Sequence, residues 1–238
     1  MSLSPLASEP PRPVQELLAE VRPRERAPEG RPFVYLNMIA TADGRAALDG
    51  RTDALGGDAD LEQLLELRVL ADAVLIGTGT LRAEGYDRLV RSRERRARRT
   101  AAGLAEDPLA VIISRGLDVP WDAGLFRADE QPVVVYTESD GEAPVEVVRL
   151  DDASPRAVLA DLRARGVRAL LCEGGPTLNR ALLAAGVVDE LFLTVSPLLT
   201  GDPAAPHIVE GDRLPEPARI ELRWALRSES ELFLRYGL

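Results

Sequence analysis

The sequence predicts an α/β fold in which helices flank a mostly parallel central sheet and an antiparallel hairpin forms the C-terminal end. Short, continuous apolar runs alternate with segments of helical periodicity, a pattern typical of parallel strands joined by helices. Residues 219–227 and 231–236 instead alternate apolar and polar side chains, as the strands of a hairpin do. Hydrophobic residues make up 45% of the 238, which suffices for one full core.

Residues 1–31 carry prolines at six positions, so we expect an N-terminal arm with one short helix near 14–21. A single domain then runs over 32–238, because no change of composition marks a second boundary. Its first strand, at 33–40, is apolar throughout except for Asn37, which suits a strand buried on both faces.

Asp58 is expected to cap a helix that runs to about residue 71, with Leu61, Leu64 and Leu65 as its inward stripe. Ser154 followed by Pro155 indicates the start of another helix, which ends near 166. A third helix opens at 176 and ends near 186. Buried strands are predicted at 73–76, 109–113, 132–136, 145–150, 168–172 and 190–195.

Composition excludes several kinds of active site. The formal net charge is −10, all 29 basic residues are arginine, and the chain has one histidine, His207, and one cysteine, Cys172. Lysine Schiff bases, Walker-type phosphate loops, the usual zinc ligand sets and internal disulfides are therefore ruled out. An enzyme of this composition is expected to take its chemistry from a bound cofactor, with no metal.

The charge and the apolar pattern of the sequence also predict its binding partners and its cellular location. An isoelectric point near 4.8 argues against general binding to nucleic acid or to membrane surfaces. No apolar stretch approaches the roughly 20 residues that span a bilayer, and no secretory signal is visible, so we expect a cytoplasmic protein.

Two glycine-rich turns each follow a buried strand and open a helix. They are Gly77-Thr78-Gly79-Thr80 and Glu173-Gly174-Gly175-Pro176-Thr177. Either one alone is explained by a tight turn. Two such turns, both at the carboxyl ends of strands in one α/β domain, favour a site in which they clamp a pyrophosphate between them.

Several polar residues have both a structural and a functional interpretation. Arg68 projects from an apolar stripe, so it is an internal ion pair, a snorkelling side chain or a ligand for a phosphate. Ser114 and Arg115 follow a strand, where they form an exposed turn or hold a phosphate monoester such as the 2′-phosphate of NADPH. Asn37 interrupts a buried strand and Asp43 lies in the turn beyond it, and each is a core link or a pocket residue. Glu173 lies at a strand end beside the second glycine turn, where carboxylates commonly face a ligand. Glu84 is a solvated helix position or lines the same crevice. Cys172 is expected to be an inert core residue and His207 a loop residue.

The segment 88–99 holds seven arginines and one glutamate. A solvated helix face or a mobile loop is the ordinary explanation. An anion-binding lid or a nucleic-acid contact is the alternative, although no aromatic side chains are interleaved.

Four blocks make the chain resemble the pyrimidine reductases of riboflavin biosynthesis, which have a dihydrofolate-reductase-like fold. The blocks are LNMIATADGRAALDG (36–50), LRVLADAVLIGTGTLRAEGY (67–86), VIISRG (111–116) and LLCEGGPTLNRALLAAGVVDELFLTVSPLLTG (170–201). They span most of the chain after residue 32. The resemblance implies an NADPH-dependent oxidoreductase and a homodimer.

The resemblance also implies a site. Near the substrate it places Asn37, Arg68 and Glu173, with Arg68 on the ribosyl phosphate. Many relatives have lysine in place of Asn37. Glu84 matches a position near the nicotinamide. The candidates for the catalytic acid are Glu84, Asp43 and a bound water. The NADPH site would be lined by Gly77, Thr78, Gly79, Thr80, Ser114, Arg115, Gly174, Gly175, Pro176, Thr177, Leu178 and Asn179.

The implied reaction reduces 5-amino-6-(5-phosphoribosylamino)uracil, or a pyrimidine of that type, so that its ribosyl group becomes a ribityl side chain. A dihydrofolate or other pteridine reductase on the same fold is the first alternative, and Arg68 would then meet a carboxylate. A non-catalytic protein that binds nucleotides or nucleic acid through 88–99 is the second.

Overall fold

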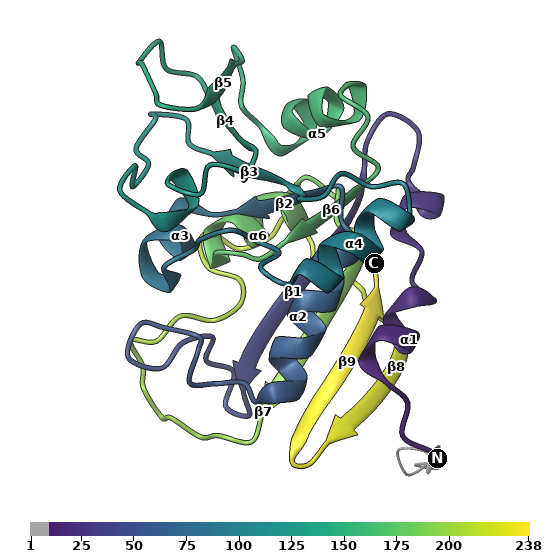
Figure 1. Cartoon of the computed structure of the whole chain (residues 1–238). Helices are drawn as coiled ribbons and strands as arrows, with labels where there is room; N and C mark the ends of the chain where they lie inside the picture. The colour runs from purple at the N-terminus through teal and green to yellow at the C-terminus, as the bar shows by residue number, and fades with distance from the viewer. Residues whose placement is uncertain (1–9) are drawn as a thin grey trace.

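The computed structural model describes residues 10–238, which form one nine-stranded sheet with the strand order β5-β4-β3-β2-β6-β1-β7-β9-β8 (Figure 1). The strands are β1 Phe33–Thr41, β2 Ala73–Ile76, β3 Leu109–Ile113, β4 Val133–Thr137, β5 Glu146–Arg149, β6 Ala169–Cys172, β7 Glu190–Ser196, β8 Glu221–Ser228 and β9 Glu231–Gly237. Strands β1 to β7 pair in parallel, whereas β9 pairs antiparallel with both β7 and β8. The predicted α/β class and the C-terminal hairpin are confirmed.

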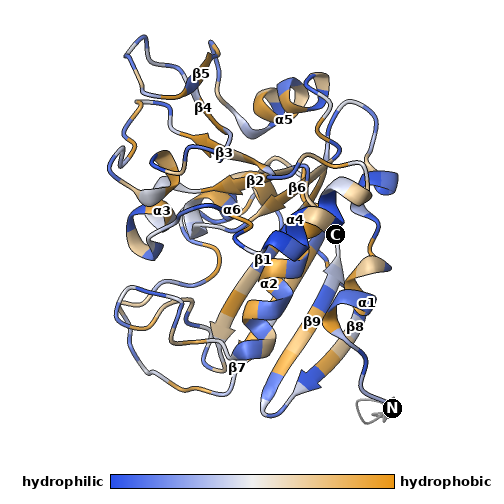
Figure 2. Cartoon of the chain, in the orientation of Figure 1, coloured by the Kyte–Doolittle hydropathy of each residue, from blue (hydrophilic) through white to orange (hydrophobic). Residues whose placement is uncertain are grey.

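Helices cover both faces of the sheet. They are α1 Val14–Ala19, α2 Asp58–Leu70, α3 Thr78–Glu84, α4 Arg93–Ala101, α5 Pro155–Ala164 and α6 Pro176–Ala184, with short 3-10 turns at Pro23–Arg26 and Gly124–Phe126. One core lies beneath α1 and α2, and a second lies beneath α5 and α6. Figure 2 shows the central strands as apolar bands between these layers, as expected for strands buried on both faces.

The helix predicted near 14–21 is α1, and it belongs to the core. Leu18 and Val21 are buried against the sheet with the residues of the first core. The part of the proline-rich segment from residue 10 onward therefore packs on the domain, while residues 1–9 lie outside the described part of the chain. None of the helices within residues 10–238 is both long and apolar enough to cross a bilayer.

The start and the inward face of α2 differ from the prediction. Gly57 is the N-cap and Asp58 the first helical residue, without a side-chain cap. Leu61 is 53% exposed, and Gln63, Glu66 and Leu67 face inward instead. The buried Glu66 is stable because α4 supplies cations: Arg95 and Arg98 both bind its carboxylate, while Gln63 bonds Asn37. An inward face of α2 predicted from apolar residues alone does not include these buried polar side chains.

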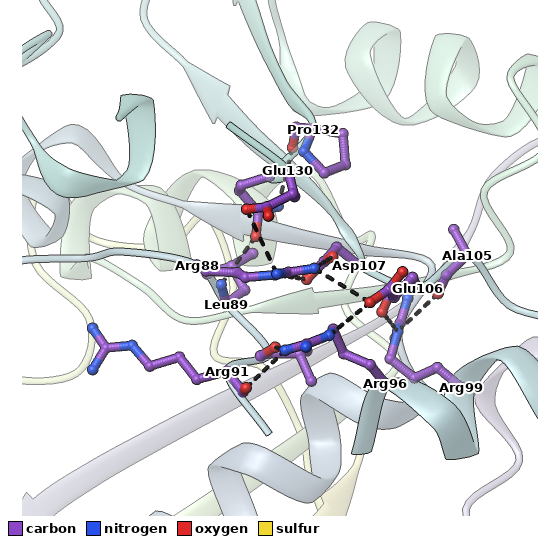
Figure 3. A network of polar contacts seen from close by, with 12 residues as sticks. Arg88, Leu89, Arg91, Arg96, Arg99, Ala105, Glu106, Asp107, Glu130 and Pro132 are labelled. Atoms are coloured by element: carbon purple, nitrogen blue, oxygen red, sulfur yellow. Dashed lines mark hydrogen bonds and ion pairs between the residues drawn. The ribbon is translucent and has the colours of Figure 1, made fainter. Parts of the chain in front are cut away.

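The arginine-rich segment is only in part a solvated face: Arg91 and Arg93 are exposed, whereas most of its other arginines are paired or buried. Arg88 and Arg96 converge on the Glu106 carboxylate, and Arg88 also binds Asp107 at 2.6 Å (Figure 3). Arg99 is fully buried, and its Nη1 donates to the carbonyl oxygens of Arg68, Val69 and Ala71. A buried cation thus satisfies the free carbonyls at the C-terminal end of α2.

Candidate active site

The two glycine turns lie against one another at the carboxyl edge of the sheet. The Gly77 N–H donates to the Gly174 carbonyl over 2.6 Å, because β2 and β6 are parallel neighbours and their following loops leave the sheet together. A Cβ on Gly77 would stand 2.7 Å from the Gly175 nitrogen, so no other residue fits there. Gly174 has a φ of +90° and is joined to Gly175 by a cis peptide bond.

Helices α3 and α6 begin at these turns, with Gly77 and Gly175 as their N-caps. Their first backbone N–H groups and the positive ends of their dipoles face the same edge of the sheet. Asn179 does not contribute as expected: its backbone N–H donates to the Gly175 carbonyl, and its buried side-chain amide donates to the Ile208 carbonyl. It is a structural residue that fixes the second turn.

Two adjoining cavities open beside the turns. The first measures about 300 Å³ and the second about 770 Å³. The boundary between the cavities is formed by residues that line both: Thr52, Asp60, Leu64, Glu84 and Tyr86. The predicted site residues that line the first cavity are Asn37, Gly79, Thr80, Glu84, Glu173, Gly174, Gly175 and Pro176.

Arg68 and Glu173 form a two-point ion pair between these cavities. Arg68 Nε lies 2.6 Å from Glu173 Oε1, and Nη2 lies 2.7 Å from Oε2. The Tyr86 hydroxyl donates to Oε2 over 2.8 Å. Burial opposes the cation, but the charge of Glu173 raises the pKa of Arg68 above its usual value. The ion-pair interpretation of Arg68 is therefore confirmed, and Glu173 has both carboxylate oxygens engaged.

Tyr86 takes part in this cluster. Burial and then the nearby Glu173 carboxylate raise the pKa of Tyr86 well above its ordinary value, so the phenol stays protonated at neutral pH. Its ring lies 5.6 Å from the Arg68 guanidinium carbon. Arg68 lines the second cavity, Glu173 the first and Tyr86 both, so the cluster forms part of the wall between them.

Glu84 and Asp43 differ in their access to the cleft. Glu84 lines both cavities; its Oε1 accepts from the Thr52 N–H, and its Oε2 has no hydrogen-bond partner within residues 10–238. Asp43 lines neither cavity and binds the Thr41 hydroxyl and the Gly201 N–H. These hydrogen bonds hold the pKa of Asp43 well below its usual value. Asp43 is a loop link, and the structure does not support it as a catalytic acid.

Asn37 proves to be both a core link and a cleft residue. Its Oδ1 accepts from Gln63 Nε2 over 3.2 Å, and Gln63 also reaches the Thr194 hydroxyl. The Asn37 amide nitrogen has no partner in the described part of the chain and borders the first cavity. It remains available to donate a hydrogen bond.

Ser114 and Arg115 lie at the end of β3, outside both cavities. Ser114 is nearly buried and its hydroxyl donates to the Asp118 carbonyl. Arg115 is exposed, and its guanidinium makes no ion pair or hydrogen bond with any residue from 10 to 238. In a chain where most arginines are paired, a free guanidinium at a strand end suits an anionic ligand.

Comparison with known proteins agrees with this geometry. The profile of the RibD C-terminal domain family matches residues 32–232. The chain belongs to this family. It is 30% identical to the 2,5-diamino-6-ribosylamino-4(3H)-pyrimidinone 5′-phosphate reductase of Methanothermobacter thermautotrophicus, over 87% of this chain and 98% of that protein. The protein of that name from Archaeoglobus fulgidus is 28% identical over 80% of this chain and 92% of its own length.

A solved structure shows the same architecture. The pyrimidine reductase-like protein of Corynebacterium diphtheriae superposes with a TM-score of 0.76 at 25% identity, covering 87% of this chain and 91% of that one. For a member of the RibD C-terminal domain family, the cleft between the glycine turns and the Arg68–Glu173 pair is the candidate active site.

Sequence reasoning missed three residues of this RibD-type cleft: Asp60, Tyr86 and Arg91. Tyr86 ends one of the blocks that carry the family resemblance, and Arg91 lies in the arginine-rich segment, but sequence reasoning assigned neither residue a role, and Asp60 belongs to no motif. Each reaches the cleft because α2 and the segment after α3 pack together. Arg91 lines the second cavity with a side chain that is 72% exposed. Cys172 is buried and His207 binds Glu210 in an exposed loop, as expected for residues outside the site.

Proposed function

We propose that this chain is an NADPH-dependent reductase of a 6-ribosylamino-pyrimidine 5′-phosphate, which it converts to the ribitylamino product. The observation that carries the proposal is the contact between the two glycine turns beside a two-part cleft with arginines at its far end. Family membership and the names of the nearly full-length relatives support the same reaction.

The residues present fit a dinucleotide. The Gly77 contact leaves no room for a side chain, which brings two helix starts close enough to share one pyrophosphate. Gly79, Thr80 and Pro176 would line the nicotinamide end in the first cavity. Arg115, with Ser114 behind it, would hold the 2′-phosphate that distinguishes NADPH from NADH.

The reduction adds a hydride to C1′ of the ring-opened imine and a proton to the adjoining nitrogen. The bound nicotinamide supplies the hydride. The chain positions C1′ beside the first cavity, excludes water and supplies the proton path. Glu84 is the acid-base group we assign to that path, because one of its oxygens is held by Thr52 and the other is free at the boundary of the cavities.

The substrate phosphate would lie in the second cavity. Arg68 lines it, although its Nε and Nη2 are committed to Glu173 and its Nη1 to the Leu89 carbonyl. Arg91 lines it with a guanidinium that extends away from the buried arginine network (Figure 3). Among residues 10–238 this guanidinium meets only Asp87, at 3.3 Å. We therefore assign Arg91 as the main phosphate ligand and Arg68 as its neighbour.

Stopped-flow absorbance at the NADPH band tests the function directly. Mixing enzyme and NADPH with the phosphorylated ribosylamino-pyrimidine should produce multiple turnovers, with a much smaller rate for dihydrofolate. Absence of turnover above background would contradict the proposal. Equal or faster use of dihydrofolate would assign the chain to the pteridine reductases instead.

A second copy of the chain is the partner we propose for one face of the hairpin. The strand register places apolar side chains of β7, β9 and β8 on a single face: Leu191, Leu193, Val195, Leu232, Leu234, Tyr236, Leu222 and Ala225. All are half-exposed or exposed, whereas Phe192 and Phe233 on the opposite face are buried. Arg227, paired with Leu232, lies at one end of this otherwise apolar face. A largely apolar sheet face of this kind is typical of an interface between subunits.

A further inference from the structure

The segment that carries Arg91 has no regular backbone pairing. Residues 85–92, between α3 and α4, form neither helix nor strand. In the described part of the chain, the backbone groups of residues 86–91 make no hydrogen bond to other backbone groups. A segment of this kind is mobile unless side chains supply the missing partners.

Side chains from two other elements hold the middle of the segment. The Leu89 N–H donates to Gln131 Oε1 over 2.9 Å, and the Leu89 carbonyl accepts from Arg68 Nη1 over 3.0 Å. The side chains of Leu89 and Val90 are both buried. The main chain at position 89 is therefore fixed through both of its polar groups.

Arg96 on α4 holds the next two residues (Figure 3). Its Nη1 donates to the Val90 carbonyl over 3.0 Å and to the Arg91 carbonyl over 2.7 Å. Its Nε donates to Glu106 Oε1 over 2.8 Å, so the guanidinium is bound at two of its nitrogens. Ser92 follows directly as the N-cap of α4. The main chain of Arg91 is thus held at its own carbonyl and on both sides.

The Arg91 side chain is not held in the same way. It is 72% exposed, lines the second cavity and, among residues 10–238, meets only Asp87, at 3.3 Å. Exposed pairs of this kind contribute little to stability. A phosphate dianion carries more charge than one carboxylate and presents three oxygens, so it is expected to displace Asp87 from this guanidinium. Arg91 therefore combines a fixed main chain with an available cation.

The other arginines that line the second cavity are each ion-paired with a buried carboxylate. The pairs are Arg68–Glu173, Arg88–Asp107 and Arg95–Glu66, at 2.6–2.9 Å. Because a buried carboxylate that loses its cation is costly, these arginines are expected to keep their partners when a ligand enters. The position of Arg91 therefore decides how well this cavity binds an anion.

We propose that Arg96 is a positioning residue of the substrate-phosphate site: it holds the Val90 and Arg91 carbonyls and thereby directs the Arg91 guanidinium at a phosphate monoester in the second cavity. The inference rests on the proposed reductase function and deepens it. It also assigns a function to part of the arginine-rich segment 88–99.

The expected effect follows from the cost of ordering the ligand. A guanidinium on a mobile main chain loses backbone and side-chain freedom when it binds a phosphate, whereas one on a fixed main chain loses only side-chain freedom. A main chain displaced by about 1 Å also misaligns the two parallel hydrogen bonds that a guanidinium donates to a phosphate. Loss of Arg96 is therefore expected to weaken phosphate recognition about tenfold.

The decisive variant is Arg96→Gln, which shortens the side chain and removes the guanidinium. The substrates are the phosphorylated ribosylamino-pyrimidine and its dephosphorylated form, each measured with NADPH. The ratio of their kcat/KM values should fall about tenfold in R96Q, because only the phosphorylated substrate meets Arg91 through its phosphate. A general loss of structure would lower both values alike and leave the ratio unchanged.

Arg91→Ala shows whether Arg96 acts through Arg91. This variant should lower the ratio at least as far as R96Q does. The double variant R91A/R96Q should have the same ratio as R91A alone, since Arg96 then has no phosphate ligand to position. A further fall of about tenfold in the double variant would overturn the inference.

Two further variants complete the test. Arg165→Gln makes the same chemical change at an arginine that is likewise bound through Nε and Nη1, to Asp161 and Glu146, but lines neither cavity, so the ratio should stay the same. Glu106→Ala removes the carboxylate that binds Arg96 Nε, and it should lower the ratio in the same direction as R96Q. The Glu106 side chain is 57% exposed, so this variant is expected to fold. If R96Q does not fold, as judged by its thermal unfolding, Glu106→Ala decides.

A binding measurement separates this inference from the proposed function. Ribose 5-phosphate, titrated calorimetrically into the enzyme, probes the phosphate site without turnover, and its Kd should rise about tenfold in R96Q. Reduction of neither substrate would overturn the proposed function, and the titration would then decide the role of Arg96, with no binding or an unchanged Kd counting against it. Where the unmodified chain turns over, an unchanged ratio in folded R96Q would overturn the role of Arg96 and leave the reductase function intact.

Discussion

The Arg68 guanidinium and the Glu173 carboxylate meet at two points, at 2.6 and 2.7 Å, and join the last turn of α2 to the end of β6. The pair is almost fully enclosed, with side-chain exposures of 13% and 4%. The pair therefore fixes the position of α2 relative to the end of β6 at the cleft. Arg91 is the more accessible cation of the second cavity.

Breaking this pair from one side is expected to be costly. Arg68→Met leaves the Glu173 carboxylate buried without its cation and should lower the free energy of unfolding by about 3–5 kcal/mol. The double variant Arg68→Met with Glu173→Leu removes both charges and should be less destabilised than the sum of the two single changes. Urea unfolding of the three variants measures this coupling. Additive losses would show that the pair contributes nothing beyond its separate side chains.

The two glycines of the first turn are expected to respond differently to alanine. A Cβ at Gly77 meets the Gly175 nitrogen at 2.7 Å, so Gly77→Ala should force the two turns apart, with losses of both stability and cofactor affinity. A Cβ at Gly79 meets nothing within 4 Å, so Gly79→Ala should fold at least as well as the unmodified chain.

Thermal unfolding and NADPH titration by fluorescence separate these effects. Because Gly79 lines the cleft, its alanine variant should weaken NADPH binding without a loss in Tm. Equal Tm values for the Gly77→Ala variant and the unmodified chain would show that the observed contact between the turns is not needed for folding.

Arg115 is expected to distinguish NADPH from NADH. Removing the guanidinium in Arg115→Ala deletes a charge-assisted contact to the 2′-phosphate and should lower kcat/KM for NADPH by about tenfold or more, with little change for NADH. Arg127→Ala, at another exposed arginine, is the matched control. A proportional loss with both cofactors would place Arg115 outside the 2′-phosphate site.

Cys172 should be unreactive in the folded protein across the physiological pH range. Burial raises the pKa of this thiol to about 12, so at pH 9 only about one molecule in a thousand carries the reactive thiolate. Labelling with a thiol-specific chromogenic disulfide at pH 9 should be negligible in buffer and complete in urea, where the pKa returns to its ordinary value. Rapid labelling of the native protein would contradict the burial of β6.

The sequence predicted those features that depend on order along the chain. The strand before each glycine turn is a continuous apolar run, and parallel neighbouring strands place their carboxyl ends together. That the two turns lie close to one another could therefore be expected from the sequence. The antiparallel hairpin was equally visible, because its alternation differs from the apolar runs before it.

Features that depend on pairing across the fold could not be predicted in this way. The inward face of α2 is polar because Arg95 and Arg98 arrive from α4, and no local pattern reveals that partner. Asp60 carries no motif, and its place at the boundary of the two cavities depends on how α2 packs in the fold. Asp43 was assigned to the site from its place after β1, yet its hydrogen bonds run to Gly201, far along the chain.

The apolar face of the hairpin is expected to join two copies of the chain. Leu193 lies at its centre, paired with Leu234 on β9, so Leu193→Glu places a charge where apolar side chains would meet across the interface. Sedimentation equilibrium should show a dimer for the unmodified chain and a monomer for this variant. Leu199→Glu is the control, because that leucine is 80% exposed and lies beyond the end of β7. A monomer for the unmodified chain at micromolar concentration, or an unchanged dimer in Leu193→Glu, would exclude this face as the interface.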